Sequence, residues 1–158
     1  MKLKHVLFLF LGILLISSCQ KDKQKLIVGE WQIKEARVEN MDKYLNELKE
    51  KYQFTDKDLQ REKERVQALP TSFYPQGITM KFDADGKYYL GGIEGKWTYN
   101  PDNDQIKIQL AILDTTTFII KKITRKELVL IYPYKVSDVD LNFELVLTRV
   151  KAEEDNQE

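Results

Sequence analysis

The sequence predicts an all-β protein: an eight-stranded, up-and-down antiparallel barrel with a two-helix insertion between the first and second strands. From residue 77 to residue 150, apolar and polar residues alternate, and turn residues interrupt the alternation at short intervals. Residues 40–70 instead repeat apolar residues at helical spacing. Many short strands favour a sandwich or a barrel, and closure removes the exposed edges of an open sheet.

The first strand is expected over residues 30–38, where Trp31 and Ile33 share one face. The second and third strands flank the turn at Asp85-Gly86, because glycine readily adopts the positive φ of tight hairpin turns. In the last strand, alternation points Glu144 outward, away from its apolar neighbours. The remaining segments follow the same pattern, and the predicted strands after the first are residues 77–83, 87–90, 93–99, 106–110, 115–123, 126–132 and 141–150.

The insertion at residues 40–70 reads as two helices. Its first half carries an apolar stripe that runs from Met41 to Tyr52 with spacings of three and four residues. Thr55 and Asp58 have the spacing of a capping box, which predicts the start of the second helix. Pro70 is expected to end that helix, because proline cannot donate the backbone hydrogen bond that a helix interior needs.

The first 18 residues have the layout of a secretory signal. Lys2 and Lys4 precede an apolar run that is shorter than the roughly 20 residues of a membrane-spanning helix. Residues 16–19, Ile-Ser-Ser-Cys, resemble the bacterial lipobox, in which the cysteine is lipidated and becomes the new N-terminus. We therefore expect a lipoprotein signal peptide over residues 1–18 and acylation at Cys19, which holds the protein to a membrane. The alternative is an ordinary signal peptide with an incidental cysteine.

The mature chain divides into a tether at residues 19–25, a barrel domain at residues 26–150 and a disordered acidic tail at residues 151–158. The start of the tether resembles the charged tag of surface-exported lipoproteins in Bacteroidetes, and the alternative is a plain solvated linker. The expected location is the outer membrane, with the domain displayed at the cell surface or facing the periplasm.

Composition excludes several kinds of chemistry. Removal of residues 1–18 removes the only histidine, His5, and leaves Cys19 as the only cysteine. No histidine- or thiol-based nucleophile and no histidine or thiolate metal site then remains, so we expect neither an enzyme nor a cofactor. The loss of Lys2 and Lys4 leaves 23 basic and 25 acidic residues, which gives no reason to expect nucleic acid.

A calcium loop is a second kind of site to consider, because Asp83 and Glu94 occupy positions one and twelve of an EF-hand spacing. Lys87 stands where the fifth position needs an oxygen ligand, and Tyr88 stands where the sixth needs glycine. The segment is therefore expected to be a hairpin turn.

Four short motifs carry a family resemblance: Gly29-Glu30-Trp31, Asp85-Gly86-Lys87-Tyr88, Gly95-Lys96-Trp97 and the final strand segment at residues 145–150. With these motifs the chain resembles the lipocalin-like lipoproteins of Bacteroidetes over residues 26–150. The resemblance implies that Arg149 on the last strand packs over Trp31 and closes one end of the barrel. A cation–π stack of this kind is worth about 0.5–2 kcal/mol.

The interior of a barrel of about eight strands holds either side chains alone or one small ligand. If the interior holds a ligand, the protein binds a small apolar or amphipathic molecule inside the barrel. If side chains fill the barrel instead, the charged second helix, with Lys57, Arg61 and Glu64, docks a protein partner. The candidate ligand contacts are Met80, Phe82, Tyr88, Trp97, Tyr99, Phe118 and Tyr132.

Overall fold

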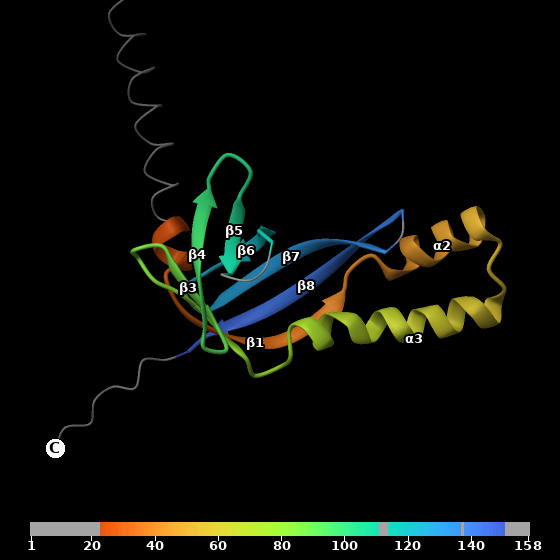
Figure 1. The fold of residues 1–158 in the computed structure, drawn as a ribbon, viewed down its shortest axis with the longest axis horizontal. Coiled ribbons are helices and arrows are strands. Elements are labelled where there is room, and N and C mark those ends of the chain that lie inside the picture. The colour runs from red at the N-terminus through yellow and green to blue at the C-terminus, as the bar shows by residue number, and fades with distance from the viewer. Residues whose placement is uncertain (1–22, 111–113, 137, 151–158) are drawn as a thin grey trace, which may run out of the picture.

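The protein is a closed barrel of eight antiparallel strands, in which each strand pairs with its neighbours in sequence and the last pairs with the first (Figure 1). The computed structural model describes residues 23–110, 114–136 and 138–150. Strand β1 (Gly29–Val38) lies between β2 (Thr79–Phe82) and β8 (Val139–Arg149). The predicted fold class is confirmed, whereas the signal peptide, Cys19 and the acidic tail lie outside the described residues.

The remaining strands have the up-and-down order that the alternation predicts. They are β3 (Lys87–Leu90), β4 (Ile93–Asn100), β5 (Gln105–Leu110), β6 (Thr116–Ile123) and β7 (Glu127–Val136). In this order the turns β2–β3, β4–β5 and β6–β7 meet at one end of the barrel, which we call the closed end. The β3–β4 turn and the helical insertion lie at the opposite end, which we call the mouth.

Strands β7 and β8 continue beyond the barrel as a long hairpin, and the two inserted helices pack on this extension (Figure 1). Helix α2 (Met41–Tyr52) contacts β8, and helix α3 (Asp56–Phe73) contacts β1. The helices do not share the main barrel core. They form a second apolar cluster with the hairpin, whose buried members are Tyr44, Leu48, Val66, Val139, Leu141 and Phe143.

Helix α3 begins as predicted and ends later than predicted. The Thr55 side chain accepts from the Asp58 backbone N–H, and the Asp58 carboxylate accepts from the Thr55 backbone N–H, so the capping box is complete. The helix then continues through Pro70 to Phe73, which corrects the expected end at residue 70. Pro70 is buried, and the Tyr74 backbone N–H donates to its carbonyl at 2.8 Å. Packing and this bond to the proline carbonyl outweigh the one hydrogen bond that proline cannot donate.

The N-terminal segment also differs from expectation. Residues 23–27, the first of which fall in the predicted tether, form a short helix directly before β1. The helix ends in Ile27, which is fully buried in the barrel core. Among the described helices, none is long and apolar enough to cross a membrane.

Candidate functional site

The closed end is built around Arg149, whose guanidinium lies 4.2 Å from the centre of the Trp31 ring. The two residues are direct partners in the β1–β8 ladder, so the sheet register itself brings them together. The Trp31 indole N–H donates to the Ile27 carbonyl at 2.8 Å. The arginine predicted to pack over Trp31 is therefore in contact with it, at the end of the barrel opposite the helices.

In both Gly-x-Trp motifs, a side chain at the glycine position would clash with a neighbouring group. Gly29 has a φ of +136°, and a Cβ there would lie 2.1 Å from Nη1 of Arg149. A Cβ on Gly95 would lie 2.5 Å from the Gln109 carbonyl oxygen of the neighbouring strand. Any larger residue would push the arginine or the strand away, so each motif marks a close approach within the barrel wall.

Four of the seven candidate ligand contacts lie deep in the barrel. Met80, Phe82, Tyr88 and Trp97 are all buried in one core. The Phe82 ring packs 5.1 Å from the Tyr88 ring and 5.4 Å from the Trp97 ring, the latter edge to face. The Trp97 indole N–H donates to the Asp83 carbonyl at 2.9 Å. These rings contact one another closely, as in a barrel whose interior is occupied by its own side chains.

Tyr99 is only partly buried, at the edge of the barrel core. Its hydroxyl donates to Asp104 at 2.8 Å, in the β4–β5 turn at the closed end. Burial, together with the hydrogen bond to Asp104, raises the pKa of Tyr99 to about 12. The Tyr99 ring packs against the barrel core, while its hydroxyl is already paired with Asp104 at the closed end.

The last two candidates, Phe118 and Tyr132, lie nearer the mouth, with their ring centres 5.5 Å apart. Tyr74, the residue directly after α3, packs edge to face against both, at 5.9 Å and 6.1 Å. From Tyr132 the ring contacts continue out to the hairpin and the end of α3. We call this continuous set the mouth aromatics, and its members are Phe73, Tyr74, Phe118, Tyr132, Tyr134 and Phe143.

Four of the mouth aromatics were not predicted as site residues. Phe73 and Tyr74 belong to the end of the insertion, where no strand alternation indicates an inward direction. Phe143 was assigned to the last predicted strand, whereas Tyr134 lies beyond the predicted end of the strand at residues 126–132. The sequence does not show that the two strands extend past the barrel. An aromatic pair next to the turn at Pro75 is the only local signal for this region.

The tyrosine hydroxyls differ in their hydrogen bonding. Those of Tyr44 and Tyr52 donate to Glu62 and Asp138. The hydroxyls of Tyr74, Tyr88 and Tyr132 donate to none of the described residues. Burial raises the pKa of all three, so each hydroxyl stays protonated and remains a hydrogen-bond donor at neutral pH.

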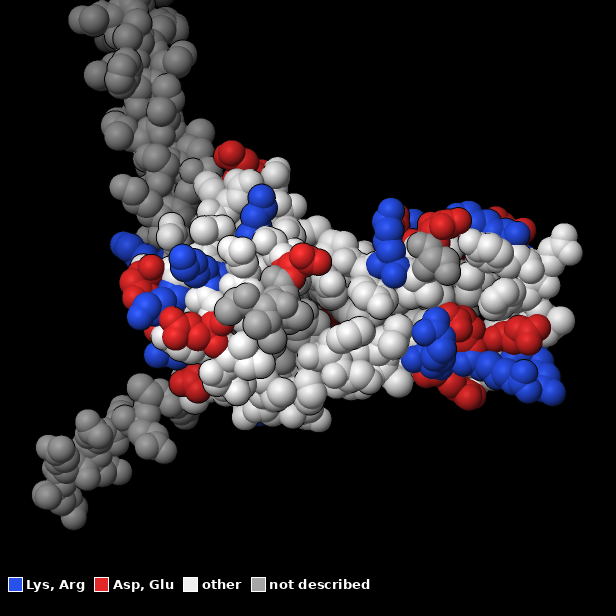
Figure 2. Space-filling model, in the orientation of Figure 1, with Lys and Arg blue, Asp and Glu red and all other residues white. Residues whose placement is uncertain are grey.

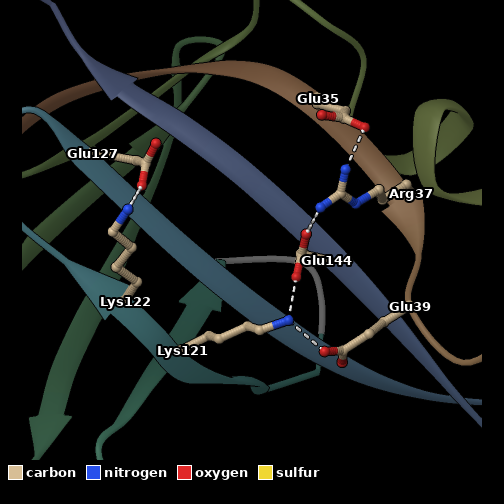
Figure 3. Close-up of polar contacts among 7 residues, drawn as sticks. All are labelled: Glu35, Arg37, Glu39, Lys121, Lys122, Glu127 and Glu144. Atoms are coloured by element: carbon tan, nitrogen blue, oxygen red, sulfur yellow. Dashed lines mark hydrogen bonds and ion pairs between the residues drawn. The ribbon is translucent and has the colours of Figure 1, made fainter.

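The only buried acidic or basic side chain in the described part of the chain is Glu144, on the outer face of β8 (Figure 3). It was expected to point outward, and it does, but it is only 3% exposed because long basic side chains cover it. Lys121 donates to one carboxylate oxygen at 2.6 Å and Arg37 to the other. Lys121 also contacts Glu39 at 2.5 Å, and Arg37 contacts Glu35 at 3.0 Å.

The charges of this network lie on the outside of the barrel and not in its interior. Burial alone would raise the pKa of Glu144, but the hydrogen bonds from Lys121 and Arg37 outweigh burial and lower the pKa. The network joins β1, β6 and β8 on the outside, and the buried members of the barrel core are all apolar or aromatic. In the described residues, no group of three or more acidic, histidine or cysteine side chains lies close enough to hold a metal ion.

Fold and site together define a closed eight-stranded β-barrel with a packed closed end, an uncharged interior and a mouth lined by aromatic residues. No protein-family model matches the chain, and no curated protein matches it.

Proposed function

We propose that the protein is a membrane-anchored lipoprotein of the lipocalin-like kind, which holds a small neutral molecule, apolar or amphipathic, against the mouth aromatics. The observation that carries the proposal is the continuous run of rings from Phe118 in the barrel to Phe73 at its rim. Phe73 remains 50% exposed although it contacts Tyr134 and Phe143. Figure 2 shows an uncharged band between the charges of the barrel and those of the helices. The mouth aromatics themselves form an apolar surface with a few hydroxyl groups, which is typical of small-molecule sites.

The charge of the ligand follows from the interior. A carboxylate or ammonium group placed among the mouth aromatics would find no opposite charge in the barrel core, and an unpaired buried charge is strongly disfavoured. The hydroxyls of Tyr74, Tyr88 and Tyr132 supply donors, so an ether, carbonyl or hydroxyl oxygen on the ligand would be favoured. We therefore propose a neutral amphiphile rather than a free fatty acid.

The anchor and the location are part of the same proposal. The lipobox-like residues before Cys19 support acylation there, and the signal sequence supports export. We propose an outer-membrane position, displayed at the surface or facing the periplasm. A binding role rather than catalysis is proposed because the mature chain has no histidine and no free thiol.

The first test uses a C19S form without lipid, examined by native mass spectrometry and then by titration with a long-chain alcohol and the fatty acid of equal length. We expect a complex of one alcohol molecule per chain and weaker binding of the acid. Failure to bind either compound, together with an empty protein in the mass spectrum, would contradict the proposal.

A matched pair of variants tests the position of the site. F73A removes roughly half a phenylalanine side chain of contact, or about 1 kcal/mol, which weakens binding about fivefold. I119A is the control, because Ile119 on β6 is 37% exposed, pairs with Gln105 toward the closed end and takes no part in the mouth aromatics. Equal affinities of the two variants would show that the ligand binds elsewhere.

A protein partner is the second candidate function, and the packing of Phe82, Tyr88 and Trp97 favours it, since a filled barrel leaves less room for a ligand. Lys57, Arg61 and Glu64 are all exposed on α3. Charge reversal at these three positions would abolish capture of such a partner from cell extracts and leave binding of the alcohol unchanged.

A further inference from the structure

The N-terminal segment is fastened to the closed end of the barrel. Lys23, the first described residue, forms an ion pair with Asp104 of the β4–β5 turn at 2.7 Å. Hydrogen bonds from Lys23 and Tyr99 help to lower the pKa of Asp104, so its carboxylate stays ionised at neutral pH. Four residues further on, Ile27 is fully buried and its carbonyl accepts from the Trp31 indole. Both ends of the short helix are therefore held.

Arg149 completes the attachment. It donates to the carbonyl oxygens of Leu26 at 2.5 Å and Val28 at 2.9 Å, and its Nε donates to the Arg125 carbonyl in the β6–β7 turn at 2.8 Å. One side chain thus joins the N-terminal segment, β8 and a closed-end turn while it stacks on Trp31. Residues 23–28 cannot leave the barrel without breaking these contacts.

The length of chain before Lys23 then limits where an anchored protein can lie. Four residue steps separate Cys19 from Lys23, and a fully extended chain spans at most about 14 Å over that length. The far end of the molecule is much more distant, because β8 has 11 residues and a strand rises about 3.4 Å per residue, or about 34 Å in all. Helices α2 and α3 lie alongside the extended β7–β8 hairpin at that far end (Figure 1).

We propose that the closed end of the barrel rests on the lipid bilayer, with the mouth and helices α2 and α3 directed away from it. The proposal rests on the proposed acylation of Cys19. Ligand exchange would then take place on the aqueous side, because the mouth aromatics do not face the anchoring bilayer. The closed-end turns carry charges of both signs, among them Asp85, Asp102, Arg125 and Lys126, so the short attachment rather than surface charge sets the orientation.

The test uses the full-length lipoprotein in phosphatidylcholine vesicles, with one added cysteine as the site of a fluorescent label. Cys19 is the only natural cysteine, so acylation leaves the added thiol as the one reactive position. K126C places the label in the β6–β7 turn, and K57C places it at the start of α3; both side chains are exposed. A spin label on the lipid head groups quenches only fluorophores close to the surface.

We expect strong quenching from position 126 and little from position 57. A flexible Gly-Ser segment of about 30 residues, inserted between Asp22 and Lys23, should abolish the difference by allowing the domain to leave the surface. Equal quenching at the two positions, stronger quenching at position 57, or no effect of the insertion would overturn the orientation.

Failure of the anchor itself has a different signature. A protein that does not float with the vesicles, and whose mass shows no acyl chains, would refute the proposed acylation and the orientation with it. A protein that floats and carries the acyl mass, yet shows equal quenching at both positions, would refute the orientation alone.

Discussion

Arg149 is the side chain on which the closed end depends, and its removal should destabilise the whole barrel. In R149A, the stack on Trp31 is lost, together with the two partly buried hydrogen bonds to Leu26 and Val28. A value of about 1 kcal/mol for the stack and about 1 kcal/mol for each bond gives a loss of about 3 kcal/mol in unfolding free energy. That loss is a large part of the 5–15 kcal/mol typical of a domain.

The conservative variant separates charge from geometry. R149K keeps the positive charge but has no planar fork, so it can reach fewer of the carbonyls at once, and we expect a loss of about 2 kcal/mol. R125A is the control. It removes an exposed arginine of the adjacent turn whose backbone carbonyl, not its side chain, contacts Arg149, and should change stability by less than about 0.5 kcal/mol.

Urea unfolding followed by far-ultraviolet circular dichroism measures these differences, because a shift in midpoint at constant slope reports stability alone. A double-mutant cycle with W31L, which removes the aromatic ring, isolates the pairwise interaction between the two side chains, which we expect at about 0.5–2 kcal/mol. The stabilising role of Arg149 would be refuted if R149A lost no more stability than R125A, or if the cycle gave no coupling.

The close approach at Gly29, the Glu144 network and the buried tyrosines each give one further prediction. G29A places a Cβ 2.1 Å from Nη1 of Arg149 and should cost about 2 kcal/mol, less in the R149A background, by the same urea assay. The lowered pKa of Glu144 stabilises the fold above its ordinary value of 4.5, and this contribution is lost as pH falls through the lowered value. E144Q should therefore flatten the acid side of the stability–pH profile. E127Q is the control, because Glu127 lies on the same outer face and pairs with Lys122 (Figure 3). An unchanged slope in E144Q would contradict the role assigned to Glu144. The affinity for the neutral alcohol should vary little between about pH 6 and pH 9, because burial raises the pKa of Tyr74 and Tyr88 above the ordinary value of 10. Fluorescence titration at each pH tests this. A tenfold change in affinity over that range would contradict it.

Sequence patterns predicted what depends on local spacing. Period-two alternation located the strands, and the Thr55–Asp58 spacing located the capping box, because each pattern reports which atoms lie side by side along one segment. The Trp31–Arg149 contact was implied by family resemblance alone. It joins residues at opposite ends of the chain, and only the ladder register shows why they meet.

The differences arose where tertiary contacts override a local preference. Pro70 does not end α3, because burial of its ring and the bond from the Tyr74 N–H compensate for the missing donor. Lys23 was predicted to lie in a tether, but its partner Asp104 is 81 residues away in sequence. Strand alternation predicts that Glu144 is exposed, but the side chains of Arg37 and Lys121 on two other strands cover it. None of these partners can be identified from neighbouring residues.

The two ends of the barrel differ in how their polar groups are used, and this difference connects the proposals. At the closed end, the donors of Trp31 and Arg149 are satisfied by backbone carbonyls, so that end is already complete and holds the N-terminal segment rigidly. Toward the mouth, the hydroxyls of Tyr74 and Tyr132 have no partner among the described residues, and Phe73 is half exposed. A short anchor at the complete end leaves the incomplete end facing solution. That is the arrangement expected if a ligand completes the mouth and arrives from the aqueous side.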